Sequence, residues 1–153
     1  GPRAARRWLE ENGADSILKD HVCEIVGGLS FKGAGVASPM RTREGKIVQD
    51  ADRLDAMGAI GIARAFAYGG HRGRLLYDPT VPPERHDSFE AYQRSASPTL
   101  NHFHEKLLLL KDQMNTPAAR AIAERRHRYM ESFIKRFLDE WEGKDWDPGF
   151  CEF

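Results

Sequence analysis

Residues 44–58 read Glu44-Gly45-Lys46-Ile47-Val48-Gln49-Asp50-Ala51-Asp52-Arg53-Leu54-Asp55-Ala56-Met57-Gly58, and three aspartates fall within six positions of this largely apolar segment. At about 100° per residue, the apolar positions predict a helix that continues to the glycine pair at 69 and 70. One face of this helix collects the apolar stripe expected of a packed helix. The stripe consists of Ile47, Ala51, Leu54, Gly58, Ile62 and Ala65.

The three carboxylates lie at the margins of this stripe. Asp52 and Asp55 fall at one edge, and Asp50 falls near the other. Carboxylates beside a buried face are costly unless an arginine or a metal ion meets them. The alternative is an Asp-rich first turn of a helix, which the helix dipole favours without any ligand. The residues alone leave both interpretations open.

The composition is that of an ordinary globular chain. Of 153 residues, 30% are charged and 41% are hydrophobic, which suits one domain with a real core and does not indicate disorder. Basic and acidic residues number 23 each, so there is no net field to attract nucleic acid or a membrane surface. The two cysteines fit a reduced compartment, and no apolar run reaches membrane-spanning length. We therefore expect a cytoplasmic protein with no nucleic-acid or membrane partner.

Helical patterns run through most of the chain, and no β-alternation is convincing. We expect one all-α domain over residues 1–153, with about five helices and one long irregular connection at 69–88. Pro2, Asp15 or Ser16, and Thr116-Pro117 are helix-start signals. The expected helices cover 2–12, 16–28, 44–70, a short segment at 89–94, a segment opened by Ser97-Pro98-Thr99 with Leu100 to Leu110 on its core face, and 117–142.

Two groups of basic residues each admit two interpretations. His71, Arg72 and Arg74 either bind an anionic substrate or form a solvated turn. Residues 120–128 are rich in arginine, but interleaved glutamates and the zero net charge favour a solvated face over a nucleic-acid footprint. Histidines 102 and 104 point to different sides of a helix, so at most one of them faces a site together with Lys106.

Several segments resemble one known family when they are taken together. They are 45–61, 63–66, Gly73-Arg74, Tyr77-Asp78-Pro79, Asn101-His102-Phe103-His104-Glu105-Lys106-Leu107, 111–116 and the last helix. They are similar to the HD-domain metal-dependent phosphohydrolases, and most of all to the subgroup with bacterial nucleotide pyrophosphohydrolases. The resemblance covers nearly the whole chain. It implies an all-α helical bundle of the HD-domain type that hydrolyses a phosphate ester or the pyrophosphate bond of a nucleotide, with a metal-activated water.

The resemblance also implies roles for individual residues. The family binds a divalent ion such as Mn²⁺ or Mg²⁺ through a histidine, a later His-Asp pair and a final Asp. That Asp stands in an Ala-Asp-Arg/Lys-Leu motif, here Ala51-Asp52-Arg53-Leu54, so Asp52 is the expected metal ligand. Asp52 and Lys106 are the expected catalytic residues. Arg64, His102 and Lys111 are expected to bind substrate, and Asp50 and Asp55 to orient ligands or neutralise arginines.

The sequence departs from the family pattern in its histidines. No His-Asp pair precedes Asp52, and the pair His86-Asp87 lies after it. We therefore expect a C-terminal portion of a longer phosphohydrolase, active only when the missing ligands are present. The alternative is a fragment or pseudoenzyme that holds no metal and acts as an interaction module. Loss of N-terminal helices would expose the core-facing residues Trp8, Leu9 and Phe66, and this exposure would favour a homo-oligomer.

Overall fold

In a computed structural model of the protein, residues 1–29, 40–84 and 97–146 are described. These residues form six α-helices and a 3₁₀ helix without any strand, so the all-α prediction is confirmed for this part of the chain. The expected helix at 89–94 and the His86-Asp87 pair lie outside the described residues. The elements are α1 (Pro2–Glu11), α2 (Ser16–Gly28), α3 (Arg43–Asp55), α4 (Gly58–His71), α6 (Asn101–Glu105), the 3₁₀ helix η1 (Leu107–Gln113) and α7 (Pro117–Trp141).

Local capping signals set where several helices begin. The Asp15 carboxylate accepts a 2.8 Å hydrogen bond from the backbone N–H of Leu18 at the start of α2. Thr116 does the same for α7, where its hydroxyl accepts a 3.2 Å hydrogen bond from the N–H of Ala119. Each cap satisfies a backbone donor that the first helical turn leaves without a partner. These starts follow the sequence prediction.

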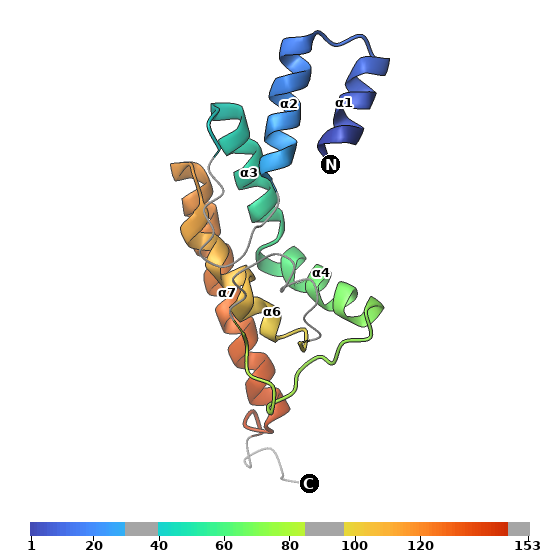
Figure 1. The fold of residues 1–153 in the computed structure, drawn as a ribbon. Helices are drawn as coiled ribbons and strands as arrows, with labels where there is room; N and C mark the ends of the chain where they lie inside the picture. The colour runs from blue at the N-terminus through green and yellow to red at the C-terminus, as the bar shows by residue number, and fades with distance from the viewer. Residues whose placement is uncertain (30–39, 85–96, 147–153) are drawn as a thin grey trace.

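The prediction of one continuous helix over 44–70 is wrong, because the chain turns between α3 and α4. Met57 has an extended backbone, with φ −115° and ψ 161°, and its side chain is 1% exposed. Gly58 follows with φ +73°, a left-handed conformation that strains any residue with a Cβ. The turn directs α4 away from the line of α3, as Figure 1 shows. Insertion of Met57 into the core is the physical reason for the break.

The buried face of α3 also differs from the predicted apolar stripe. Gln49 and Asp50 are 1% and 3% exposed, whereas Ile47 is 50% exposed and Ala51 is exposed. The reason is the partner of α3, which is the polar junction between η1 and α7. Backbone and side-chain donors at this junction need acceptors, so α3 presents a polar face to it.

The segment opened by Ser97-Pro98-Thr99 does not form one long helix as predicted. The α-helix α6 has five residues, and after Lys106, with φ −144°, the chain continues as the 3₁₀ helix η1. Side chains three apart lie on the same face of a 3₁₀ helix. Leu107 and Leu110 are therefore both buried, at 3% and 2% exposure. The tighter helix brings these two leucines into the core together.

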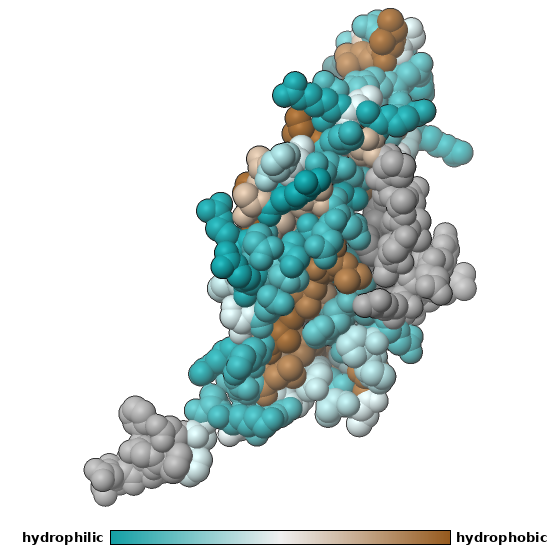
Figure 2. Space-filling model, turned by 90° about the vertical axis from the view of Figure 1, so that its left-hand side faces the viewer, coloured by the Kyte–Doolittle hydropathy of each residue, from teal (hydrophilic) through white to brown (hydrophobic). Residues whose placement is uncertain are grey.

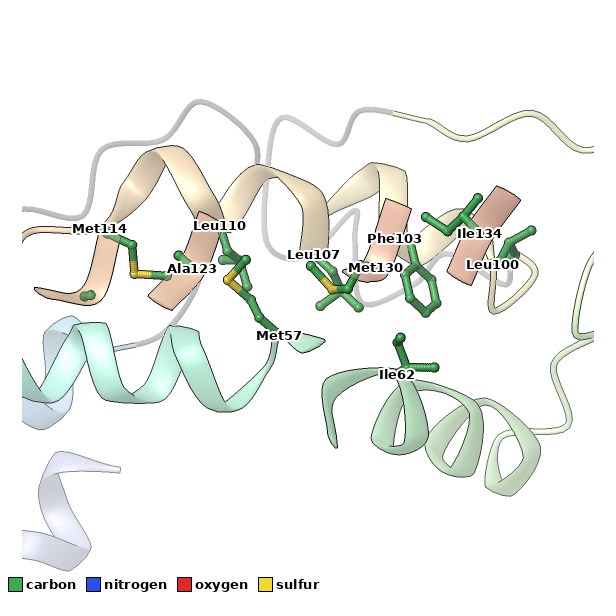
Figure 3. Packing of buried hydrophobic residues seen from close by; sticks show 11 residues of the cluster. Met57, Ile62, Leu100, Phe103, Leu107, Leu110, Met114, Ala123, Met130 and Ile134 are labelled. Atoms are coloured by element: carbon green, nitrogen blue, oxygen red, sulfur yellow. The ribbon is translucent and has the colours of Figure 1, made fainter. Parts of the chain in front are cut away.

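The core lies where α7 meets α4, α6 and η1. In Figure 3, Ile62 of α4 points toward Phe103, and Met57 extends toward Leu110. Beside these residues, the ring of Phe66 lies 5.9 Å from the rings of Phe103, Phe133 and Phe137. The expectation that Phe66 would be an exposed apolar residue is therefore wrong, because it packs among these aromatic rings.

The hairpin of α1 and α2 extends from one end of the molecule (Figure 1), and Ile25 is the one residue of these two helices that is buried. No residue of α1 is buried, and Trp8 is 62% exposed, as expected from the sequence. Figure 2 shows a strip of hydrophobic residues between hydrophilic ones on another face of the molecule. Among the described helices, none is long and apolar enough to cross a membrane.

Two glycines of α4 provide a matched test of this packing. A Cβ at Gly61 would overlap the backbone carbonyl of Ala56, which cannot move aside, whereas a Cβ at Gly70 would meet nothing within 4 Å. We expect Gly61→Ala to lower the free energy of unfolding by about 1–3 kcal/mol through overpacking. Gly70→Ala is expected to raise it by up to about 1 kcal/mol through helix propensity. Urea unfolding followed by circular dichroism measures both, and equal effects would contradict the proposed packing.

Candidate functional site

A cavity of about 690 Å³ lies between one face of α4 and the segment from Thr99 to Leu107. On α4 its lining residues recur at three- and four-residue intervals, as expected for one helical face. Opposite them lie His102 and Lys106, which are also four positions apart. The full lining is Ala56, Gly61, Arg64, Ala65, Ala67, Tyr68, Gly69, Arg72, Arg74, Thr99, His102, Lys106 and Leu107.

Close backbone contacts hold the two walls of the cavity together. A Cβ at Gly69 would overlap the Thr99 hydroxyl, so glycine is what allows Thr99 to approach α4. The N–H of Thr99 donates to the carbonyl of Leu75 at 2.8 Å, and the N–H of Leu100 donates to that of Leu76 at 3.0 Å. These bonds draw the segment after α4 against the start of α6, and Arg74 comes with it to the cavity wall.

The cavity is cationic. Arg64, Arg72, Arg74 and Lys106 line it, and its lining residues, all in the described part of the chain, include no aspartate or glutamate. Its volume falls in the range of small-molecule sites. Guanidinium and ammonium groups are the usual protein partners of phosphate, and arginine binds it through paired hydrogen bonds. Such a cavity is suited to a small anionic ligand.

Two partly buried bases lie along one wall of this cavity. Burial, together with the charges of Lys106 and Arg74, lowers the pKa of His102 to about 4, so its imidazole is neutral at pH 7. Burial also lowers the pKa of Lys106, against the opposing effect of Asp52, while Arg64 lowers it further. His102 therefore lies within the field of Arg74 and Lys106, and Lys106 within the field of Arg64 and Asp52. Arg64 lies in the first half of α4 and Arg74 follows the end of that helix, so we call the two parts of the cavity the Arg64–Lys106 end and the Arg74 end.

The lowered pKa of His102 predicts a pH dependence of stability. In the unfolded chain imidazole titrates near pH 6.5, so between about pH 6.5 and 4 the unfolded chain binds a proton that the folded chain does not. The free energy of unfolding is thus expected to fall as the pH is lowered through this window, by up to about 3 kcal/mol. Urea unfolding of wild type and His102→Gln across the window measures the effect. An unchanged pH slope in the variant would contradict it.

The predicted aspartates divide into two groups in the structure. Asp52 is exposed and lies within electrostatic reach of Lys106, but it is outside the cavity lining. Asp55 forms an ion pair with Arg64 across the turn between α3 and α4. Both partners are more than half exposed, so the pair contributes little to stability but restrains the arginine. These two acids border the Arg64–Lys106 end of the cavity.

Asp50 lies elsewhere, in the contact between α3 and the start of α7. Its carboxylate accepts four hydrogen bonds of 2.8–2.9 Å, from the backbone N–H and side chain of Asn115 and of Thr116. Burial alone would raise the pKa of Asp50, but these bonds outweigh it and hold the pKa below its usual value. Asn115 also donates to Gln49, which in turn donates to the carbonyl of Gly28 in α2. Asp50 thus belongs to a network that joins α2, α3 and α7.

Of the three predicted substrate-binding residues, the cavity brings two together. Arg64 and His102 line it, whereas Lys111 lies in η1 and pairs with Glu124 of α7 at 3.8 Å. Of the basic residues in the connection after α4, Arg72 and Arg74 line the cavity. Tyr68 and Thr99 are lining residues that the sequence interpretation missed. The signal for Tyr68 was its position midway between Arg64 and Arg72, four residues from each.

The described residues do not fit a divalent metal ion by themselves. Within residues 1–29, 40–84 and 97–146, no three His, Cys, Asp or Glu side chains are close enough together to hold one. Asp52 is a single exposed carboxylate, and one carboxylate does not define a coordination geometry. What the structure provides at this site is the cationic cavity.

The chain is similar in sequence and in structure to several bacterial proteins. No family model matches the sequence. Bacillus subtilis YpgQ is 43% identical over 127 residues, which are 82% of this chain and 54% of YpgQ. A crystal structure of YpgQ in complex with ADP is similar with a TM-score of 0.66, at 36% identity, over 92% of this chain and 63% of that one.

Two further solved structures are similar. A protein from Lactobacillus plantarum has a TM-score of 0.81 at 39% identity, over 88% of this chain and 64% of its own. An HD-superfamily hydrolase from Bacillus thuringiensis has a TM-score of 0.65 at 51% identity, over 93% of this chain. The family resemblance in the sequence is thereby confirmed. The chain is a homologue of the HD-superfamily hydrolases, and it spans 63% of the length of the Bacillus thuringiensis protein.

Proposed function

We propose that the cationic cavity binds the phosphate groups of a nucleotide, as part of an HD-type phosphohydrolase that cleaves a phosphate ester or pyrophosphate bond. The observation that carries this proposal is the lining of the cavity, with four cations and no carboxylate among its described residues. The volume of about 690 Å³ is sufficient for a ligand of nucleotide size. The ADP complex of YpgQ, a relative, supports a nucleotide as the ligand class.

Each residue has a role that its surroundings support. Arg64, restrained by Asp55, and Lys106 would hold the phosphates at the end of the cavity bordered by the acids. Neutral His102 can donate one hydrogen bond to a phosphate oxygen without adding charge. Positive groups placed where negative charge develops are the main protein contribution to phosphoryl transfer. Arg64 and Lys106 are the groups proposed for this role.

Hydrolysis is proposed for the whole protein, since this chain spans less than two thirds of each relative described above. The divalent ion of the family would need ligands in addition to Asp52, beyond those that the described residues offer. Asp52 is the ligand that this chain is proposed to provide for that ion. A homo-oligomer, expected from the exposed apolar residues, likewise stays a prediction.

The test of the proposed function is the binding of phosphate compounds to this chain. Isothermal titration calorimetry is expected to show that inorganic pyrophosphate and ADP bind, and that affinity falls between about 50 and 200 mM salt, as for other phosphate–cation contacts. Orthophosphate is expected to bind more weakly, because it spans fewer cations. Absence of binding by both pyrophosphate and ADP, or affinity that is independent of salt, would contradict the proposal.

A further inference from the structure

The wall of the cavity at its Arg74 end differs in chemistry from the rest. Among the described lining residues, Tyr68 is the one with a phenyl or indole ring. Its side chain is 57% exposed and lies between the small residues Ala67 and Gly69. The guanidinium carbon of Arg74 lies 5.9 Å from the centre of the Tyr68 ring, within cation–π range. A tyrosine ring and a guanidinium plane are the two protein surfaces on which planar ligands stack best.

The position of this pair relative to the phosphate end is also informative. Tyr68 follows Arg64 by one helical turn on the same face of α4, a rise of about 6 Å. That is roughly the length of a ribose phosphate. On the opposite wall, His102 lines the cavity one helical turn before Lys106, and both Arg74 and Lys106 are near enough to lower its pKa. A ligand with phosphates at Arg64 and Lys106 would therefore place its next planar group beside Tyr68.

We propose that Tyr68 and Arg74 form a stacking subsite for the base of a nucleoside phosphate, so that the cavity selects nucleotides over inorganic phosphates. This inference rests on the proposed function and adds a specificity-determining residue to it. Stacking recognises the flat face of a base, which purines and pyrimidines share. We therefore expect both purine and pyrimidine nucleotides to bind, and the purines to bind more tightly because of their larger stacking area.

The test compares ADP with inorganic pyrophosphate, which share their phosphates and differ in the nucleoside. Calorimetry on the full 153-residue chain is expected to show tighter binding of ADP than of pyrophosphate. Tyr68→Leu is expected to weaken ADP about tenfold and to leave pyrophosphate unchanged, since base–aromatic stacking has about this magnitude. Tyr68→Phe keeps the ring and is expected to bind ADP like wild type. The matched control is Tyr129→Leu, at a tyrosine of α7 that is 53% exposed and lies outside the lining.

The outcomes separate this inference from the proposed function. If wild type binds pyrophosphate and Tyr68→Leu affects ADP and pyrophosphate equally or not at all, the stacking subsite is wrong while the phosphate site stands. If wild type binds neither compound, the proposed function fails, and the subsite fails with it. Thermal unfolding of each variant by circular dichroism checks folding. A loss of ADP affinity in Tyr68→Phe would also overturn the inference, because it would assign the effect to the hydroxyl.

Discussion

Asp50→Ala is expected to lower the free energy of unfolding by about 3–5 kcal/mol, the largest effect that we expect from one side chain of this protein. The substitution removes the acceptor of four hydrogen bonds and leaves the part-buried N–H groups of Asn115 and Thr116 without it. It also removes the link between α3 and Thr116, the cap of α7. Urea unfolding at pH 7 measures the loss.

The matched control is Asp55→Ala, on the same helix. Asp55 is more than half exposed and pairs with one arginine, so its removal is expected to change stability by about 1 kcal/mol or less. Asp50→Asn, which keeps one carbonyl acceptor, should fall between the two. Equal effects of Asp50→Ala and Asp55→Ala would show that the network is not structural.

The lowered pKa of Asp50 adds a pH signature to this network. The folded protein holds the carboxylate ionised to lower pH than the unfolded chain does. The stabilisation is therefore complete above the ordinary pKa of an aspartate, about 3.9, and is lost as the pH falls through the lower folded value. This window lies below that of His102, so the two groups can be distinguished in one acid titration.

Lys106→Gln is expected to weaken the binding of pyrophosphate and ADP by about tenfold to a hundredfold, the usual magnitude for a hydrogen bond from a charged group. Lys106 lines the cavity, and the burial that lowers its pKa also removes water that would screen it from a phosphate. Because that pKa is lowered, affinity should begin to fall at a pH below the value for a free lysine. Calorimetric titration at several pH values measures both effects.

Lys111→Gln is the control for this prediction. Lys111 carries the same charge five residues away, but it pairs with Glu124 and lies outside the cavity lining. Its substitution is expected to change affinity less than twofold. If Lys106→Gln and Lys111→Gln lowered the affinity for pyrophosphate and ADP by similar factors, the ligand would be attracted by overall positive charge and not by a defined site.

The elements that could be predicted from sequence are those that depend on close neighbours in the chain. Pro2, Asp15 and Thr116 mark helix starts through contacts within about one turn, which operate whatever the rest of the fold does. The all-helical class follows from the same local preferences. The family resemblance, through its aspartate and Asn101-His102-Phe103 segments, directed attention to Arg64, His102 and Lys106, which the structure places around one cavity.

The orientation of α3 could not be predicted in this way. Periodicity placed the apolar stripe of α3 toward the core, but its actual partner is a polar junction 65 residues later in the chain. The residues within one helical turn of Asp50 do not indicate that Asn115 and Thr116 will be its hydrogen-bond partners. The turn at Met57 could not be predicted for the same reason. The Met57 side chain packs in a core formed by residues of η1 and α7, which are distant in the sequence.

The amino-acid sequence by itself determined the helical class, the capped helix starts and the family to which the chain is related. The tertiary structure decided which faces are buried, where the aspartate-rich helix divides, and which cations share a cavity. The physical reason is the range of the interactions. Capping and helix propensity act over one turn, whereas burial and electrostatic fields depend on residues that only the folded chain brings together. Tyr68 shows this clearly, because its place in the cavity depends on the chain that returns at Arg74 and Thr99.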